Sequence, residues 1–328
     1  MKVAMVGVTG LVGRMVMRLL EERSFPVSKF IPVASPGSQG KPVRFLGQEY
    51  LITDPGQPIR EKADIAIFSA GGDVSREWAP RYAAAGIRVI DNSSAWRMDP
   101  DVPLVVPEIN ASILTRDHFI IANPNCSTIQ LVMVLDPLHT RYRIKRIVIS
   151  TYQSVSGTGA KAVRQLENER KGIAGKAAYP HQIDLNLFPQ GGAFLENGYT
   201  TEEMKLVQET RKILDDPSIR VAPTIVRVPV MVGHSEAVNI EFSTPYDLPD
   251  IYSILSRKAG IAILDNIADN VYPMPILAEG KDEVFVGRIR RDETLENGLN
   301  LFIVSDNLRK GAATNAIQIA EYIREFLF

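Results

Sequence analysis

The sequence predicts an α/β fold with two domains, and three observations support this. Short apolar segments alternate with segments of helical periodicity over about the first 120 residues, a rhythm typical of a parallel sheet covered by helices. From about residue 220 to residue 289 most segments are strand-like, which indicates a second, α+β domain with a mixed sheet. The chain has 328 residues, enough for two domains of ordinary size.

The individual elements follow from local periodicity. In the first domain we expect strands at 2–8, 29–34, 64–70 and 88–91, and helices at 11–22 and 75–85. In the second we expect a helix at 128–139 and strands at 146–153 and 301–305. A final amphipathic helix at 310–326 is expected to return to the first domain. The predicted domains are therefore 1–122 with 306–328, and 123–305.

The composition excludes several classes of function. The net charge is −1 and no basic block stands out, so a nucleic-acid partner is not expected. No apolar run approaches the roughly 18 residues of a membrane helix, so no membrane association is expected. The single cysteine cannot form an internal disulfide, which fits a reducing, cytoplasmic location.

A glycine-rich turn joins the first strand to the first helix. A strand, a glycine turn and a helix in this order predict a dinucleotide site, hence a Rossmann-type domain. The glycines let backbone N–H groups approach a pyrophosphate, and the helix N-terminus attracts its charge. The candidate cofactor-binding residues in this turn are Gly7, Thr9, Gly10, Leu11, Val12 and Gly13.

The end of the second strand bears on which dinucleotide is bound. A carboxylate there would bind the ribose 2′-OH and repel a 2′-phosphate, but residues 33–38 contain no acid. Ser35 and Ser38 can donate to a phosphate, and Lys41 lies nearby in the sequence. The segment therefore favours NADP over NAD.

Cys126 lies in Asn-Pro-Asn-Cys-Ser-Thr, directly before an apolar helix. A helix N-terminus favours the thiolate, which is the reactive form of cysteine. Asn125, Ser127 and Thr128 are suitable capping residues for this helix. By itself, a lone cytosolic cysteine is more often a small buried hydrophobic residue.

Taken together with its neighbours, this motif resembles the nucleophile segment of the aspartate-semialdehyde dehydrogenase family. Other segments match the same family in order along the whole chain. The resemblance depends on their agreement, because no single segment would identify the family. They are DNSSAWR (91–97), VPEIN (106–110), STYQSVSGTG (150–159), EEMK (202–205), RVPVMVGHSE (227–236), FVGRIRRD (285–292) and SDNLRKGAA (305–313).

The resemblance implies a reversible, NADP-dependent reductive dephosphorylation of L-aspartyl 4-phosphate to L-aspartate 4-semialdehyde. This is the phosphorylating aldehyde oxidoreductase activity of class EC 1.2.1.11, which serves lysine, diaminopimelate, threonine and methionine biosynthesis. It implies a thioester on Cys126, with His234 as acid and base and Gln153 positioning the substrate. Arg97 and Lys205 would bind phosphate, Arg227 the α-carboxylate and Glu202 the ammonium group. Ser156, Gly157 and Asn307 would approach the cofactor.

The resemblance also implies a homodimer formed through the second domain, with a small-molecule substrate, inorganic phosphate and no metal. Two departures from the family pattern stand out. Gly37 occupies a position where many relatives have an arginine for the 2′-phosphate, so NAD use stays open, with Lys41 or Arg44 as substitute cations. The segment at 171–181 is shorter than in relatives where a helical insert contributes to the dimer.

Three alternatives remain. N-acetyl-glutamyl-phosphate reductase shares the architecture, but its substrate has no free ammonium group, so Glu202 favours the aspartyl substrate. An inactive structural relative would be expected to lose Cys126 or His234, and both are present. A sugar-nucleotide epimerase would need a Tyr-x-x-x-Lys pair, yet Tyr142 precedes an arginine and Tyr152 a serine at that spacing.

Overall fold

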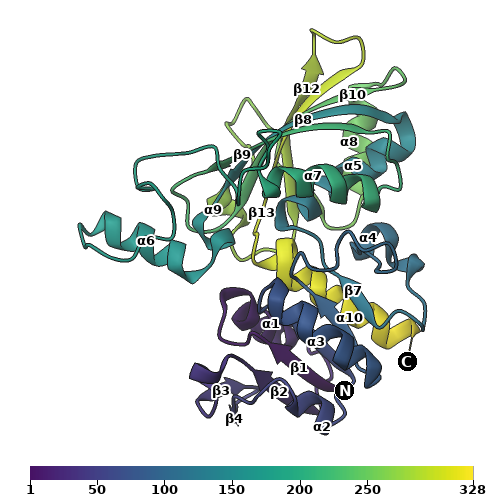
Figure 1. Ribbon diagram of the computed structural model, residues 1–328. Helices are drawn as coiled ribbons and strands as arrows, with labels where there is room; N and C mark the ends of the chain where they lie inside the picture. The colour runs from purple at the N-terminus through teal and green to yellow at the C-terminus, as the bar shows by residue number, and fades with distance from the viewer. Residues whose placement is uncertain (328) are drawn as a thin grey trace. The chain divides into compact units, whose positions relative to one another are not determined.

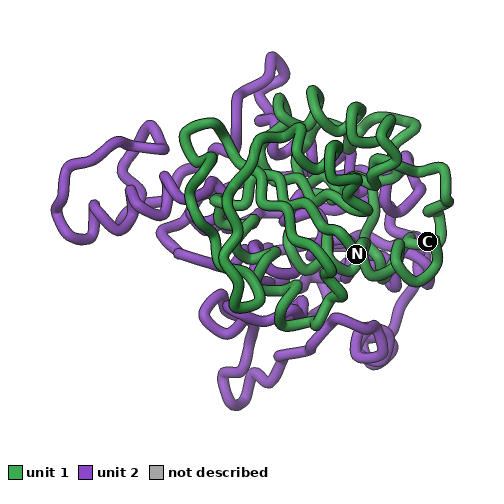
Figure 2. Tube along the Cα trace, turned by 90° about the horizontal axis from the view of Figure 1, so that it is seen from below, with its two compact units in different colours: residues 1–124, 312–328 green, residues 125–311 purple. Residues whose placement is uncertain are grey.

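The computed structural model describes residues 1–327, which form two compact units. Unit 1 consists of Met1–Pro124 and Ala312–Phe328, and unit 2 of Asn125–Gly311 (Figure 2). The domain limits expected from the sequence differ by a few residues and stay a prediction. Both divisions assign the last helix to the first unit.

Unit 1 contains a five-stranded parallel sheet in the order β2-β1-β5-β6-β7 (Figure 1). The α/β class predicted from the sequence is confirmed. The strands are β1 (Lys2–Val6), β2 (Lys29–Val33), β5 (Ile65–Phe68), β6 (Arg88–Asp91) and β7 (Ile120–Ala122). A separate antiparallel hairpin, β3 (Pro42–Phe45) with β4 (Gln48–Leu51), was not expected, and neither was β7. Both are too short to produce a clear periodic pattern.

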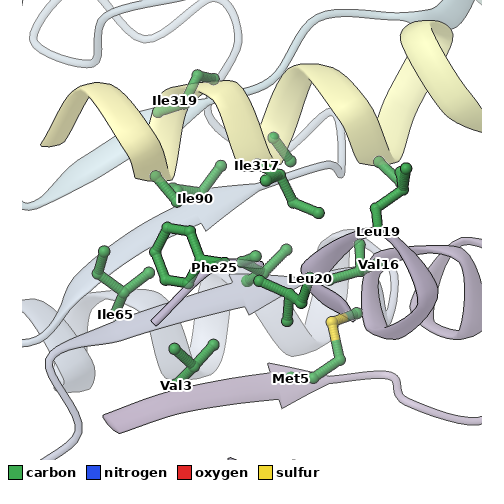
Figure 3. Close-up of a cluster of buried hydrophobic side chains, with 14 of the residues drawn as sticks. Val3, Met5, Val16, Leu19, Leu20, Phe25, Ile65, Ile90, Ile317 and Ile319 are labelled. Carbon is green, nitrogen blue, oxygen red and sulfur yellow. The ribbon is translucent and has the colours of Figure 1, made fainter. Parts of the chain in front are cut away.

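Five helices of unit 1 accompany this sheet: α1 (Leu11–Glu22), α2 (Gln57–Arg60), α3 (Gly72–Ala84), α4 (Pro107–Asn110) and α10 (Thr314–Phe326). Along β1, Val3 and Met5 point into a core shared with α1 and α10, where Leu20 and Ile317 lie (Figure 3). The intervening Ala4 belongs to a second core on the other face, with residues of α3. Because both faces are covered, β1 is apolar at every position after Lys2 rather than alternating.

Unit 2 contains a six-stranded mixed sheet in the order β11-β12-β13-β10-β8-β9. The strands are β8 (Ile144–Gln153), β9 (Arg220–Arg227), β10 (His234–Phe242), β11 (Ile261–Ile263), β12 (Val284–Asp292) and β13 (Gly298–Ser305). Strands β8 and β9 run parallel, whereas β10 is antiparallel to both β8 and β13. The mixed sheet expected for the second half of the chain is confirmed.

One face of this sheet packs against α5 (Cys126–Tyr142), α7 (Thr201–Ile213) and α8 (Leu248–Arg257). Along β8, Ile147 and Ile149 are buried on that side, whereas Val148 and Tyr152 on the other side are half-exposed. The remaining helices are α6 (Ala160–Arg170), which projects away from the sheet, and α9 (Pro275–Ala278) (Figure 1). Among residues 1–327, no helix has both the length and the apolar content needed to cross a bilayer.

Candidate active site

The candidate nucleophile, Cys126, is the first residue of helix α5, which therefore begins earlier than the predicted residue 128. The N-cap is Asn125, whose Oδ1 accepts a hydrogen bond from the backbone N of Ser127 at 3.0 Å. The cysteine is half-buried rather than sealed in the core. Because the helix N-terminus carries partial positive charge, this position suits a thiolate nucleophile.

Two adjacent residues, Gln153 and Ser154, connect this helix to His234. Gln153 ends strand β8, and its Nε2 donates to Ser127 Oγ at 2.9 Å. The backbone N of Ser154 donates to Nδ1 of His234 at 3.1 Å. A short path of hydrogen bonds and chain therefore links the start of the nucleophile helix to the imidazole of His234.

His234 is fully buried at the start of strand β10. Its Nε2 has no hydrogen-bond partner in the part of the chain that the structure describes. Ser154 offers Nδ1 both a backbone donor and a hydroxyl oxygen, each at 3.1 Å, so it can accommodate either neutral tautomer. Burial, and next the positive charge of Arg227, lower the pKa of His234 to about 3. The imidazole is therefore neutral near pH 7 in the free protein.

The lowered pKa gives a direct prediction for the free protein. The Cε1–H signal of His234, assigned with His234→Gln, is expected to stay at its neutral position between pH 7 and pH 5. Folding favours the neutral ring, so this stability is fully present above the unfolded-state pKa of about 6.5 and is lost as the pH falls toward about 3. NMR titration checks this, and a midpoint at or above pH 6.5 would contradict it.

Arg227, at the end of strand β9, lies beside Gln153 in the sheet register and is 7% exposed. Arg227 and His234 lie on different strands of this sheet. The chain leaves β9 after Arg227 and enters β10 at His234, with Gly233 at φ 93° in the connection. A Cβ at Gly157 would lie 2.8 Å from His234 Nε2 and 3.6 Å from Arg227 Nη1, so both side chains border this glycine.

Glu202 and Lys205 lie one turn apart on α7 and form an ion pair. Glu202 Oε2 also accepts a hydrogen bond from Asn125 Nδ2 at 2.9 Å. The structure thus places Glu202 against the N-cap of the nucleophile helix. An incoming ammonium group would have to compete with Lys205 for this carboxylate.

Asn307 and Ser156 both lie in unit 2 and are buried. Asn307 Oδ1 accepts hydrogen bonds from Ser154 Oγ at 3.1 Å, Ser156 Oγ at 3.2 Å and the backbone N of Gly233 at 2.8 Å. It therefore ties the turn after β8 to the residue that precedes His234. The predicted role of Asn307 and Ser156 near the cofactor stays a prediction.

The glycine turn in unit 1 fits a dinucleotide. A Cβ at Gly7 would lie 2.3 Å from the carbonyl oxygen of Ser69, and one at Gly13 would lie 2.3 Å from that of Gly7. Gly10 caps α1 without a side-chain hydrogen bond, and the first turn of α1 has no acidic residue. Backbone donors at a helix N-terminus without a side-chain cap are what a pyrophosphate requires. Thr9 is exposed at this turn, and Leu11 and Val12 begin the helix half-buried.

The segment after β2 forms a short 3₁₀ turn, Pro36–Ser38, with Ser35 exposed before it and Ser38 half-buried at its end. A Cβ at Gly37 would meet nothing within 4 Å. Lys41 and Arg44 are both exposed. No acid occupies this turn, so the features that favour NADP are retained.

Arg97 is 7% exposed and belongs to unit 1. Its Nε donates to the carbonyl oxygen of Asn123 at 2.9 Å and its Nη2 to that of Asn92 at 2.7 Å. Both acceptors also belong to unit 1, and Asn123 precedes Cys126 by three residues in the chain. The other predicted substrate residues, Glu202, Lys205 and Arg227, belong to unit 2.

Two residues of this site were missed by the sequence analysis. Ser154 holds His234, and Glu209 on α7 accepts a hydrogen bond from the backbone N of Asn125 at 2.7 Å. Ser154 lies within the matched segment 150–159 and Glu209 lies four residues after the segment 202–205, but neither has a local pattern that would distinguish it. Within residues 1–327, no group of three or more potential metal ligands comes together.

Comparison with known proteins bears on this geometry. The profile described as "semialdehyde dehydrogenase, NAD binding domain" matches residues 2–116, and "semialdehyde dehydrogenase, dimerisation domain" matches residues 135–310. The aspartate-semialdehyde dehydrogenase of Aquifex aeolicus is 51% identical over 98% of this chain and 97% of its own length. The chain belongs to the aspartate-semialdehyde dehydrogenase family. It is therefore an oxidoreductase, with a domain that binds a nicotinamide dinucleotide.

Other members of the aspartate-semialdehyde dehydrogenase family agree. The enzyme of Legionella pneumophila is 50% identical over 100% of this chain and 97% of its own. Aspartate semialdehyde dehydrogenase II from Vibrio cholerae, solved as a complex with ASA, is 44% identical, with a TM-score of 0.95 over 100% of this chain and 99% of that one. The structure from Candida albicans with NADP is 25% identical, with a TM-score of 0.78 over 98% of each chain. These relatives favour this family over N-acetyl-glutamyl-phosphate reductases and sugar-nucleotide epimerases.

Proposed function

We propose that the protein interconverts L-aspartyl 4-phosphate and L-aspartate 4-semialdehyde through a thioester on Cys126. The observation that carries the proposal is the half-buried Cys126 at the start of α5, joined to His234 through Ser127, Gln153 and Ser154. The Sγ thiolate attacks the acyl-phosphate carbon; a C–S bond forms, the C–O bond to phosphorus breaks and phosphate leaves.

A nicotinamide cofactor held at the glycine turn of unit 1 would supply the hydride that reduces this acyl group to the level of an aldehyde. Collapse of the resulting thiohemiacetal breaks the C–S bond, releases the aldehyde and regenerates the sulfur. His234 is proposed to take the thiol proton through Nε2, which makes the ring an imidazolium, and to return that proton from Nε2 to the substrate oxygen. Ser154 Oγ can accept a hydrogen bond from Nδ1–H of this imidazolium.

The charged groups of the substrate are assigned to separate partners. Arg227 is proposed to bind the α-carboxylate, since its planar guanidinium borders His234 at Gly157. Glu202 is proposed to bind the ammonium group. Lys205, released from its ion pair with Glu202 in that exchange, and Arg97 are each proposed to bind phosphate.

Replacing Arg97 with alanine is expected to raise the KM for phosphate at least about tenfold and to leave the KM for the cofactor within about twofold, because a charge-assisted pair contributes about 1.5–3 kcal/mol. Initial rates with each substrate varied in turn check this. The exposed Arg44→Ala serves as the control for loss of a positive charge and is expected to leave the KM for phosphate unchanged. Equal effects of Arg97→Ala on both KM values would contradict the assignment.

The cofactor is proposed to be NADP, because the turn at Pro36–Ser38 has no acid to repel a 2′-phosphate. Gly37 provides no cation for that phosphate, so we expect its contacts to come from Ser35, Ser38 and either Lys41 or Arg44. The double variant Lys41→Ala/Arg44→Ala is expected to lower the ratio of kcat/KM for NADP to that for NAD by about tenfold, or about 1.4 kcal/mol. A ratio unchanged in this variant would contradict the substitution of these cations.

The protein is further proposed to form a homodimer through unit 2. The face of the mixed sheet opposite α5, α7 and α8 presents half-exposed Val148, Tyr152 and Ala237, and α9 packs against it at β13, next to Phe302. The family profile that covers this unit is that of a dimerisation domain.

The experiment that tests the proposed function is phosphate-dependent oxidation of L-aspartate 4-semialdehyde, followed as reduction of NADP. The expected result is turnover that requires phosphate. N-acetyl-glutamate 5-semialdehyde serves as the competing substrate, and a higher kcat/KM for it would overturn the assignment. Absence of turnover with either aldehyde would indicate an inactive relative.

A further inference from the structure

The backbone N–H of a helix N-cap needs an acceptor, which a carboxylate three residues later commonly provides as part of a capping box. Helix α7 has such a box, in which Thr200 and Glu203 exchange hydrogen bonds. In α5 the equivalent position is Thr128, whose hydroxyl is too short to act this way. The Oγ1 of Thr128 is buried without a partner in the described chain. The nucleophile helix therefore lacks a capping box of its own.

A residue of another helix supplies the missing carboxylate. Glu209 on α7 is 1% exposed, and its Oε2 accepts a hydrogen bond from the backbone N of Asn125 at 2.7 Å. Two turns earlier on α7, Glu202 accepts from the side chain of the same asparagine at 2.9 Å. Asn125 is thus held through both its backbone and its side chain by one helix.

This arrangement has a consequence for the reacting sulfur. Asn125 immediately precedes Cys126, so the position of its peptide determines where the cysteine enters the helix. A carboxylate placed in the first turn of α5 would instead stand close to the thiolate. Misplacing a reacting group by about 1 Å can cost on the order of 10²-fold in rate.

We propose that Glu209 is a positioning residue for the nucleophile, completing from α7 the capping box of helix α5 and thereby holding Cys126 in its reactive place. The proposal rests on the role of Cys126 proposed above. In this role Glu209 acts through the peptide of Asn125, whose N–H it accepts.

The test compares Glu209→Ala with Glu209→Gln, which keeps an oxygen acceptor at the same reach. Glu209→Ala is expected to lower kcat about 10²-fold with the KM for cofactor within about twofold, because it disturbs the position of the sulfur and not the dinucleotide site. Glu209→Gln is expected to recover to within about tenfold of the wild type. Controls from the same helix are Gln208→Ala, exposed, and Thr210→Val, buried with an unpartnered hydroxyl. Both are expected to keep the wild-type kcat.

Amide hydrogen exchange at residue 125 gives a second readout that does not depend on the reaction. The exchange rate of the Asn125 backbone N–H should become at least about tenfold faster in Glu209→Ala and stay unchanged in Thr210→Val. Only Glu209→Ala removes the carboxylate that accepts this N–H. If Glu209→Ala does not fold, Glu209→Asp, which withdraws the carboxylate by one methylene, is measured in the same way. Unchanged exchange and kcat in these variants, or an equal loss of kcat in Thr210→Val, would overturn the proposal. A wild-type protein inactive on the aldehyde would overturn the proposed function, while the exchange result would still test the cap.

Discussion

Replacing Cys126 with serine is expected to reduce kcat for aldehyde oxidation by at least about 10⁴-fold, because a serine hydroxyl is scarcely ionised where a thiol becomes thiolate. No other residue can replace it, since the chain contains one cysteine. The thermal midpoint should move by only a few degrees, because the side chain is half-buried at a helix end. Steady-state kinetics and circular dichroism measure the two quantities.

Thiol labelling provides the control for this variant. In the wild type, incorporation of one equivalent of iodoacetamide should parallel the loss of activity, and bound substrate should slow both. The Cys126→Ser protein should incorporate none. A serine variant that keeps more than about a hundredth of the wild-type kcat would be incompatible with a thioester intermediate.

Gly157→Ala is the second substitution with a large expected effect. The new methyl group would lie 2.8 Å from both Cε1 and Nε2 of His234, closer than van der Waals contact allows. The imidazole is fully buried and cannot move aside freely, so its reactive nitrogen would be displaced or blocked. We expect kcat to fall about 10²–10³-fold, comparable with the loss of general acid–base catalysis.

The matched control is Ala160→Ser, which adds one heavy atom at an exposed position just after the same turn. It should leave kcat within about twofold, because an exposed surface change of this size is nearly neutral. The imidazole signal of His234 should shift in Gly157→Ala and remain unchanged in Ala160→Ser. Wild-type kcat in Gly157→Ala would mean that His234 does not act at this edge of its ring.

Local properties of this protein could be predicted from its sequence. The predicted strand, glycine turn and helix are found as β1, the turn that begins at Gly7, and α1. The α/β class is confirmed. The local pattern did not show where β9 ends and β10 begins, with Arg227 on the first strand and His234 on the second. Spacing along the chain cannot reveal that a strand ends, turns and re-enters the sheet two positions away.

By itself, the sequence determined the class of the fold and the start of the nucleophile helix to within a few residues, because periodicity and capping depend on neighbouring residues. Only the tertiary structure decided which polar groups complete the site. The bond from Asn125 to Glu209 spans 84 residues, and that from Ser154 to His234 spans 80. Hydrogen bonds between such distant residues depend on how strands and helices pack, and that packing leaves no mark in the local pattern of either segment.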